Sequence, residues 1–524
     1  MAARPDARAV SQVGALLSWP FYYLEVALHY LLGNAKRGAS NKYLQGNFSP
    51  VTAEVYETEL EVEGELPPDL SGCFLRTGPN PQYRPLGGYH WFDGDGMVHA
   101  CRIKDGKVSY SNKWVKTQRY LQEQAVGWPS SGKLGDLAGV GGLVCLALSG
   151  VKRILGVIRD GRGTANTAMV YHAKRLLALH EGDMPYALKV LCEGAVETVE
   201  RVSFGEMKAF TAHPKVDHAT GFMHFFGYDL ERRPHCTYGV VDPSGQLIKS
   251  VPIDIPKPVM MHDFAITANH SIFLDTPLAF DPKVMVKEGK LPFVFDKEKG
   301  LLFGVRPHAA AEGDKEAVKW FTLPAQMIFH VANAWEDGDV IHVYACAMDY
   351  LDLNMLSAEG VEMGEDSLPY LHHYALNMKD GSASATRLTN AIGDFPQIDQ
   401  RLAGVQTRYV YCASDKDMAN TTFGDIIKLD LQAGGDDICC GRITLGAYKA
   451  GGEAIFVPRR AAASEDDGYL LTYVYDQSND TSEMVVYDAK TMSQSPLARV
   501  KLPQRVPYGF HALFMDEAQV AGQS

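Results

Sequence analysis

Short apolar runs of strand length, separated by turn residues, make up most of the chain from about Tyr56 onward. In residues 237–249, 374–388 and 470–487, two apolar runs flank a turn, which contains Asp242-Pro243-Ser244-Gly245, Asp380-Gly381 and Asn479-Asp480 respectively. Turn residues of these types between apolar runs predict β-hairpins. Many hairpins and few long helices favour an all-β chain. A β-propeller explains one continuous unit of this length better than a sandwich does, although no strict sequence period accompanies the repeat.

Two segments depart from this pattern. Residues 16–32 carry apolar side chains at mostly helical spacing, which predicts either an amphipathic helix at a membrane interface or a helix packed on its own domain. Residues 137–158 form the most apolar stretch outside the strands. They predict either a surface patch that dips into a membrane, where Lys152 and Arg153 meet the headgroups, or a buried lid helix. Neither segment has the roughly 18 uncharged apolar residues that a membrane-spanning helix needs.

The amino-acid composition limits which classes of binding partner and which cellular compartment we expect. The chain has 524 residues with 49 Gly and 27 Pro, which fits many short strands and turns. Its formal net charge of −13 argues against nucleic acid as a partner, because phosphate binding needs a basic surface. Nine cysteines without a Cys-x-x-Cys pair indicate reduced thiols in a cytosol-like compartment. We therefore expect a cytoplasmic protein bound peripherally to membranes, with a plastid as the alternative location.

Four histidines stand in similar settings, each at the end of a short apolar run: His213, His262, His330 and His511. Imidazoles from strands that lie far apart in the sequence suggest ligands that converge on a common axis. Taken singly, such a histidine is more often a core or turn residue than a ligand, and the chain offers 17 histidines to choose from. The pattern is therefore weak on its own.

Three carboxylates inside apolar strands add to the pattern: Glu181, Asp394 and Glu453. A carboxylate in an apolar strand is costly unless it is paired, and metal-binding histidines usually donate their second ring N–H to a carboxylate. Alternatively, each could cap a turn or pair with an arginine such as Arg401 or Arg459. Four neutral imidazoles would leave two positions of an octahedral ion open, which suits ferrous iron better than closed tetrahedral zinc. These residues alone indicate a possible metal site in a propeller.

Across residues 50–513, nearly the whole chain, the sequence resembles the carotenoid cleavage oxygenases. The resemblance is carried by Phe74-Leu75-Arg76-Thr77-Gly78-Pro79-Asn80-Pro81, Trp91-Phe92-Asp93-Gly94-Asp95-Gly96-Met97, Met261-His262-Asp263-Phe264, Glu453-Ala454-Ile455-Phe456-Val457-Pro458-Arg459 and Tyr508-Gly509-Phe510-His511. It implies a seven-bladed β-propeller with a helical cap over the top face and Fe²⁺ on the axis. By motif, the iron ligands fall on His213, His262, His330 and His511. The carboxylates that hydrogen-bond these ligands fall on Glu181, Asp394 and Glu453.

The resemblance is strongest to the plant-type branch that cleaves the 9,10 and 9′,10′ double bonds, as in Gly393-Asp394-Phe395-Pro396. Asp394 departs from the Glu common in the family, but this branch tends to have Asp there. His180 occupies a place that is more often aromatic or apolar, and we assign it no role. The implied domains are an N-terminal helical segment at 1–49, a candidate for membrane contact, and a catalytic propeller at 50–524 with cap helices inserted at about 121–160.

The function that this resemblance implies is a non-haem iron(II) dioxygenase. It would cleave carotenoids or apocarotenoids with O₂ at 9,10 and 9′,10′, giving apocarotenoid ketones and aldehydes. Such a reaction strictly requires no acid or base from the protein, so we name no catalytic residue beyond the iron centre. One alternative is cleavage of stilbene-type phenolics on the same fold, which needs polar groups deep in the pocket. Another is a non-catalytic propeller that binds lipid.

Overall fold

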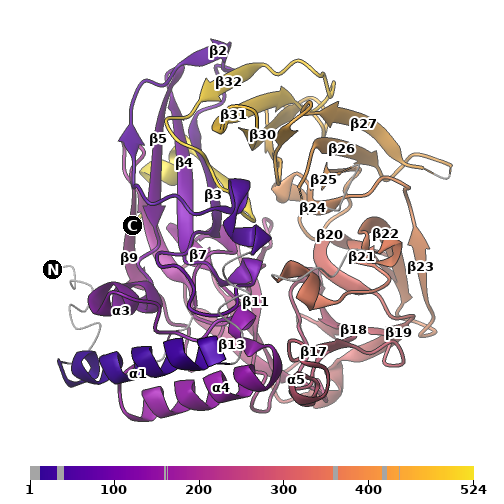
Figure 1. Cartoon of the computed structure of the whole chain (residues 1–524). Helices are drawn as coiled ribbons and strands as arrows, with labels where there is room; N and C mark the ends of the chain where they lie inside the picture. The colour runs from indigo at the N-terminus through magenta and orange to yellow at the C-terminus, as the bar shows by residue number, and fades with distance from the viewer. Residues whose placement is uncertain are drawn as a thin grey trace.

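Seven antiparallel sheets form a ring around a central axis in the computed structural model (Figure 1). It describes residues 12–31, 41–158, 161, 163–357, 364–415, 422–435 and 437–524. Each sheet has four to six strands, and we number these blades 1 to 7 around the ring. The expected seven-bladed, all-β propeller is confirmed.

Blade 1 consists of β1 (Tyr56–Glu57), β3 (Gly72–Pro79), β4 (Gly96–Lys104), β5 (Lys107–Trp114) and β33 (Ala512–Asp516). Blade 2 consists of β6 (Ala168–His172), β7 (Arg175–Leu179), β8 (Tyr186–Val190) and β9 (Val196–Arg201). Blade 3 consists of β10 (Lys215–Val216), β11 (Met223–Tyr228), β12 (Cys236–Val241) and β13 (Leu247–Ile253).

Blade 4 consists of β14 (Phe264–Ile266), β15 (His270–Asp275), β18 (Leu301–Pro307) and β19 (Lys319–Leu323). Blade 5 consists of β20 (Met327–Asp337), β21 (Val340–Met348), β22 (Tyr370–Asn377) and β23 (Ala383–Arg387). Blade 6 consists of β24 (Asp394–Gln397), β25 (Tyr409–Ser414), β26 (Asp425–Asp430) and β27 (Cys439–Thr444). Blade 7 consists of β2 (Val62–Gly64), β28 (Lys449–Ala450), β29 (Ile455–Pro458), β30 (Gly468–Asp476), β31 (Thr481–Asp488) and β32 (Ala498–Lys501). A small hairpin, β16 (Leu278–Phe280) and β17 (Phe293–Phe295), extends from blade 4.

The three predicted hairpins are confirmed, as β12–β13, β22–β23 and β30–β31. In the first, Oδ1 of Asp242 accepts hydrogen bonds of 2.9 Å from the backbone N–H groups of Ser244 and Gln246, which fixes the turn. Apolar side chains fill the spaces between neighbouring blades; Val343 and Leu274, for example, belong to one buried cluster that joins blades 4 and 5. The core is thus a series of layers around the axis, and the axis itself is left for polar groups.

Both ends of the chain close the ring. Strand β33, late in the sequence, pairs with β3, so that Ala512 lies opposite Arg76. Strand β2, early in the sequence, pairs with β32 in blade 7. Just before β33 the backbone passes very close to β3, because a Cβ on Gly509 would lie 2.7 Å from the carbonyl oxygen of Thr77. Only glycine fits this approach.

Helices gather on one side of the ring (Figure 1): α1 (Gln12–Leu31), α3 (Gln118–Val126), α4 (Gly139–Ile154) and α5 (Lys283–Glu288). The short helix α6 (Glu517–Ala521) follows β33, and the 3₁₀ turns are η1 (Lys42–Leu44), η2 (Gly46–Phe48), η3 (Trp91–Asp93), η4 (Leu134–Leu137), η5 (Lys315–Ala317), η6 (Leu353–Leu356), η7 (Glu365–Ser367) and η8 (Gln400–Leu402). Helices α3 and α4 fall within or next to the segment expected to form a cap. A cap over the top face and the domain division stay predictions.

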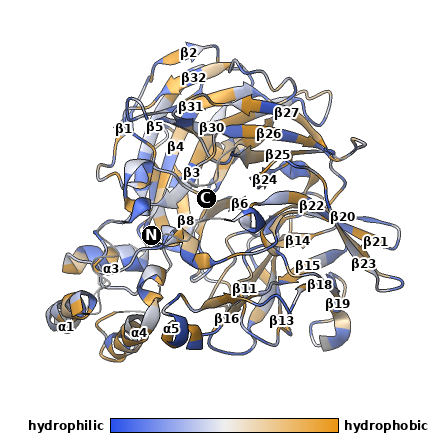
Figure 2. Ribbon diagram, turned by 45° about the vertical axis from the view of Figure 1, so that its right-hand side comes forward, coloured by the Kyte–Doolittle hydropathy of each residue, from blue (hydrophilic) through white to orange (hydrophobic). Residues whose placement is uncertain are grey.

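Helices α1 and α4 are packed within the protein, and membrane contact, the other alternative for both segments, stays a prediction. They pack on each other, and Lys152 Nζ donates to Glu25 Oε1 at 2.6 Å and to the carbonyl of Ser130 at 2.5 Å. The expectation that Lys152 meets lipid headgroups is therefore wrong, because this ammonium is buried and paired inward. Both helices contain hydrophobic segments (Figure 2). Their exposed apolar residues are Trp19, Tyr23, Leu24, Val26, Tyr30, Leu31, Val140, Val144, Val151 and Ile154. Within the described residues, no helix combines the length and apolarity needed to cross a bilayer.

Candidate metal centre

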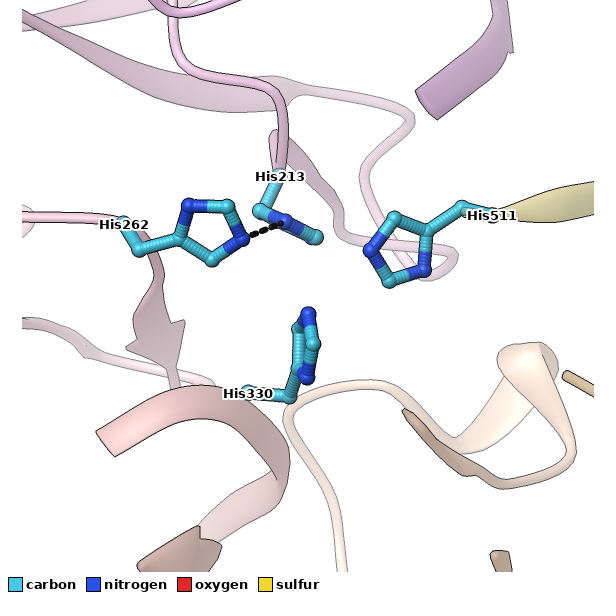
Figure 3. A group of neighbouring side chains, drawn as sticks. All are labelled: His213, His262, His330 and His511. Atoms are coloured by element: carbon cyan, nitrogen blue, oxygen red, sulfur yellow. Dashed lines mark hydrogen bonds between the residues drawn. The ribbon is translucent and has the colours of Figure 1, made fainter. Parts of the chain in front are cut away.

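The four predicted histidines meet on the axis of the ring (Figure 3). Their candidate ligand atoms all lie within 4.8 Å of one another. Each histidine lies in or immediately before the strand that lines the axis in its blade: His213 before β10, His262 before β14, His330 within β20 and His511 before β33. His262, His330 and His511 are buried, and His213 is partly buried.

The three predicted carboxylates hold three of these imidazoles. His330 Nδ1 donates to Asp394 Oδ1 at 2.8 Å, and His511 Nδ1 donates to Glu453 Oε1 at 2.8 Å. His262 Nδ1 contacts Glu181 Oε1 in the same way. The alternative partners are excluded, because Arg401 pairs with Asp399, and Arg459 pairs with Asp467 and Asp488.

Each blade contributes one residue to this arrangement. Histidines come from blades 1, 3, 4 and 5, and carboxylates from blades 2, 6 and 7. The pairs Asp394–His330 and Glu453–His511 join neighbouring blades, whereas Glu181 of blade 2 reaches past blade 3 to His262 of blade 4. Among the described residues, no carboxylate accepts a hydrogen bond from His213, the ligand of the blade that is passed over.

The tautomers favour cation binding. A neutral imidazole that donates from Nδ1 keeps its lone pair on Nε2, so His262, His330 and His511 aim lone pairs at one point. The Nε2 atoms of His213 and His262 lie 3.0 Å apart (dashed line in Figure 3). Two adjacent ligands of one ion, each about 2.1 Å from it, show nearly this separation. Imidazoles suit iron, zinc, copper and nickel, so these residues fit the Fe²⁺ expected from the sequence.

Burial governs the charge state of the cluster. Burial and the neighbouring imidazoles lower the pKa of His213 well below its ordinary value. Burial also lowers the pKa of His511, although Glu453 acts in the opposite direction. For His330, burial again opposes the charge, but Asp394 outweighs it and raises the pKa. His213 and His511 are thus neutral electron-pair donors at neutral pH, as metal binding requires.

Two bulges place aromatic rings against the imidazoles. In β20 the register shifts between Ile328 and His330, and the extra residue, Phe329, lies 5.3 Å from the ring of His262. In β24 the register shifts after Asp394, and Phe395 has a φ of 54°, which is unusual for a bulky residue. Its ring lies 4.8 Å from that of His330 and 5.1 Å from that of His511. These bulges form an apolar wall beside the centre.

A cavity of about 1220 Å³ leads to the imidazoles from the helical side. Its lining near the centre is apolar and includes Phe92, Met260, Phe329, Phe395 and Phe510. A second cavity, of about 710 Å³, approaches from the other side, and His213 and His330 are part of its lining. His330 and His511 border both cavities, so the four-histidine cluster lies between them.

Sequence reasoning missed two side chains that hold the carboxylates. Tyr228 donates from its hydroxyl to Glu181 Oε2 at 2.5 Å, and Gln397 Nε2 donates to Glu453 Oε1 at 2.7 Å. Burial acts in the opposite direction, yet His262 and Tyr228 lower the pKa of Glu181. Tyr228 and Gln397 each stand at the end of a strand, and no sequence pattern distinguishes them from other strand ends. The one available signal was for Gln397, which directly follows the Gly393-Asp394-Phe395-Pro396 motif. His180, which had no assigned role, accepts a hydrogen bond from the backbone N–H of Gly182.

The chain is similar to known proteins along most of its length. The RPE65 family model, described as retinal pigment epithelial membrane protein, matches residues 48–516. A carotenoid 9,10(9′,10′)-cleavage dioxygenase of Crocus sativus is 44% identical over 518 residues, which cover 95% of this chain and 93% of that relative.

Two solved structures share the fold. The lignostilbene dioxygenase of Pseudomonas brassicacearum has a TM-score of 0.79 at 27% identity, covering 91% of this chain and 98% of its own. A cobalt-substituted apocarotenoid oxygenase of Synechocystis has a TM-score of 0.72 at 25% identity, covering 89% and 97%.

Proposed function

Because the chain belongs to the RPE65 family of carotenoid cleavage oxygenases, we propose that it is an Fe²⁺-dependent dioxygenase of carotenoids or apocarotenoids. Cleavage at the 9,10 and 9′,10′ double bonds is the specificity that we assign to it, in line with the Crocus sativus relative. The observation that carries the proposal is the set of four imidazoles at the inner end of a large, apolar-walled cavity.

In this proposal the protein contributes binding and orientation. His213, His262, His330 and His511 hold the metal ion, and Glu181, Asp394 and Glu453 orient three of the rings and offset positive charge. Bound Fe²⁺ supplies the reactivity toward O₂. The overall reaction breaks one carbon–carbon double bond and places one oxygen atom in each of two carbonyl products. Since no proton is gained or lost, the chain needs no acid or base.

The walls of the cavity suit a rigid apolar substrate. Phe329, Phe395 and Phe510 lie beside the imidazoles and would fix the polyene by contact along its length while excluding water. The volume of about 1220 Å³ exceeds that of typical drug-sized pockets, as a long isoprenoid requires.

Carotenoids dissolve in membranes, so the enzyme needs access to a bilayer. We assign this role to α1 and α4, which carry several exposed apolar residues, including Tyr30 and Ile154 at 77% and 86% exposure. Helix α4 ends at the rim of the cavity, where Arg153 is part of the lining. Peripheral contact at these helices would bring the bilayer next to the entrance.

Product identification by mass spectrometry tests this function. Purified, Fe²⁺-loaded protein is incubated with a bicyclic carotenoid, a linear carotenoid and resveratrol in detergent. Thirteen-carbon ketones from the bicyclic substrate are the expected result. If no substrate yields a product although iron is bound, the proposed dioxygenase activity is wrong, and a lipid-binding propeller becomes the better explanation.

A second candidate is cleavage of stilbene-type phenolics, and Lys133 favours it. Lys133 is 5% exposed and lines the cavity, and its ammonium has no hydrogen-bond or ion-pair partner among the described residues. Such a group could bind a phenolic oxygen. Phenolic aldehydes from resveratrol alone, lost in Lys133→Met, would favour this candidate over the first.

A further inference from the structure

Asp263, to which the sequence analysis assigned no role, connects segments next to three of the four histidines. It directly follows His262 and is 1% exposed. Its Oδ2 accepts a hydrogen bond of 2.7 Å from the backbone N–H of Val331, the residue after His330. Its Oδ1 lies 2.7 Å from Nζ of Lys215, which follows His213 by two residues. One carboxylate thus links positions next to His213, His262 and His330.

The arrangement supplies what His213 lacks. The other three imidazoles are each anchored by a carboxylate from a different blade, whereas His213 has none among the described residues. Among the described residues, His213 is connected to a carboxylate only indirectly. The backbone links it to Lys215, and the ammonium of Lys215 pairs with Asp263. Strand β10, which begins with Lys215, has only two residues, so its own ladder holds the preceding loop weakly.

The tie also accounts for a buried charge pair at the axis. A buried ion pair contributes little net stability by itself, and a hydrophobic pair of similar volume often serves as well. Lys215 and Asp263 both border the second cavity, which approaches the imidazoles from the side opposite the first one. Their charges therefore lie against the metal-binding cluster and not in an ordinary interface between blades.

We propose that Asp263, held by Lys215, is a positioning residue that sets the mutual placement of His213, His262 and His330 for metal binding. The inference rests on the proposed metal centre. Residues that hydrogen-bond around a ligand set typically change metal affinity between about 10- and 100-fold when removed. Asp263 acts on three ligands through the backbone, so its loss should weaken affinity within that range and also change the ligand geometry.

Titration of the metal-free full-length protein with Co²⁺ tests the inference, since Co²⁺ reports both affinity and ligand geometry in its visible spectrum. Asp263→Asn is expected to raise the Co²⁺ dissociation constant about 10- to 100-fold and to shift the visible bands. Lys215→Met should act in the same direction, and Lys215→Arg, which keeps the charge, should restore most of the affinity. If Asp263→Asn misfolds, the two Lys215 variants decide the question.

The matched control is Asp466→Asn. Asp466 forms an equally short buried pair with Lys428, 2.7 Å between Oδ2 and Nζ, which joins blades 6 and 7 and borders neither cavity. This variant should lose thermal stability but keep the wild-type Co²⁺ affinity and spectrum. Wild-type Co²⁺ binding by Asp263→Asn, or equal losses in Asp263→Asn and Asp466→Asn, would overturn the inference. Failure of the wild-type protein itself to bind Co²⁺ would overturn the metal centre, and the inference with it.

Discussion

Single residues around the centre show which features a sequence reveals. The four histidines stand out because each follows an apolar run, but this pattern is weak by itself, and their assignment as ligands came from the family motifs. The pairing could not be predicted: Glu181 holds His262 by reaching past an entire blade, and no sequence distance encodes this. Phe395 lies on a bulge with a left-handed backbone, which its sequence neighbourhood of Asp394 and Pro396 does not specify.

Removing one ligand tests the centre at this scale. His262→Ala should lose tight Fe²⁺ binding, since it deletes a ligand and leaves Glu181 without its imidazole partner. Iron analysis after gel filtration measures the effect. His218 serves as control because it is exposed and lies outside the cluster. Equal iron loss in His218→Ala would show that the assignment of ligands is wrong.

Acid stability should depend on Glu336. Burial alone would raise the pKa of Glu336, but hydrogen bonds from Thr267, His270 and Asn269 lower this pKa to about 2, from an ordinary 4.5. A lowered folded-state pKa contributes stability that is full above pH 4.5 and is lost as the pH falls toward 2. Allowing for solvent screening, this contribution is about 1–2 kcal/mol. Urea unfolding should therefore show Glu336→Gln to be less stable than wild type at pH 7, with a gap that closes near pH 2. A gap that is constant with pH would contradict this.

At the scale of elements, α1 and α4 were predicted as helices, but their orientation was not predicted. Which face of α4 turns inward depends on Lys152 meeting Glu25 of α1, 127 positions earlier in the chain. A lysine at the end of an apolar helix suggests contact with lipid headgroups. Periodicity cannot identify a distant partner such as Glu25, so the burial of Lys152 was not predicted. The exposed apolar faces are what remains after this docking.

Those faces should bind lipid. Tyr30→Ser and Ile154→Ser should each reduce binding to phosphatidylcholine vesicles by about tenfold, because burying a large apolar side chain is worth roughly 1.5–3 kcal/mol. Co-sedimentation measures the bound fraction. Tyr448→Ser is the matched control: Tyr448 is 73% exposed, against 77% for Tyr30, but lies in blade 7 before β28. An equal reduction in Tyr448→Ser would contradict a specific membrane-contacting face.

At the scale of the whole molecule, hairpin chemistry predicted the strands and pointed to a propeller, but the number of blades came from the family resemblance. The reason is that the blades share a shape without sharing a sequence. Closure is equally hidden, because β33 pairs with β3 and β2 with β32 across more than 400 positions. The ring is held by backbone ladders, which leave little trace in side-chain patterns.

Closure should be sensitive to Gly509. A Cβ there would lie 2.7 Å from the carbonyl oxygen of Thr77, so Gly509→Ala must push β3 and the segment before His511 apart. We expect a stability loss of about 1–3 kcal/mol and weaker Co²⁺ binding in the same variant. Thermal unfolding and Co²⁺ titration measure the two effects. Gly313→Ala meets nothing within 4 Å and should change neither. Unchanged Co²⁺ affinity in Gly509→Ala would mean that closure and the centre are independent.

The spread of ligands around the ring also constrains the order of events during synthesis. His213 emerges from the ribosome about 300 residues before His511, which at 5–20 residues per second is a delay of roughly 15–60 s. During that interval the nascent chain offers at most three of its four imidazoles, and Glu453, which orients the last, emerges only 58 residues before His511. If the proposed Fe²⁺ centre is correct, the four-histidine site can form only after the ring is complete, and a cell short of ferrous iron is expected to accumulate folded, metal-free protein that can still be loaded.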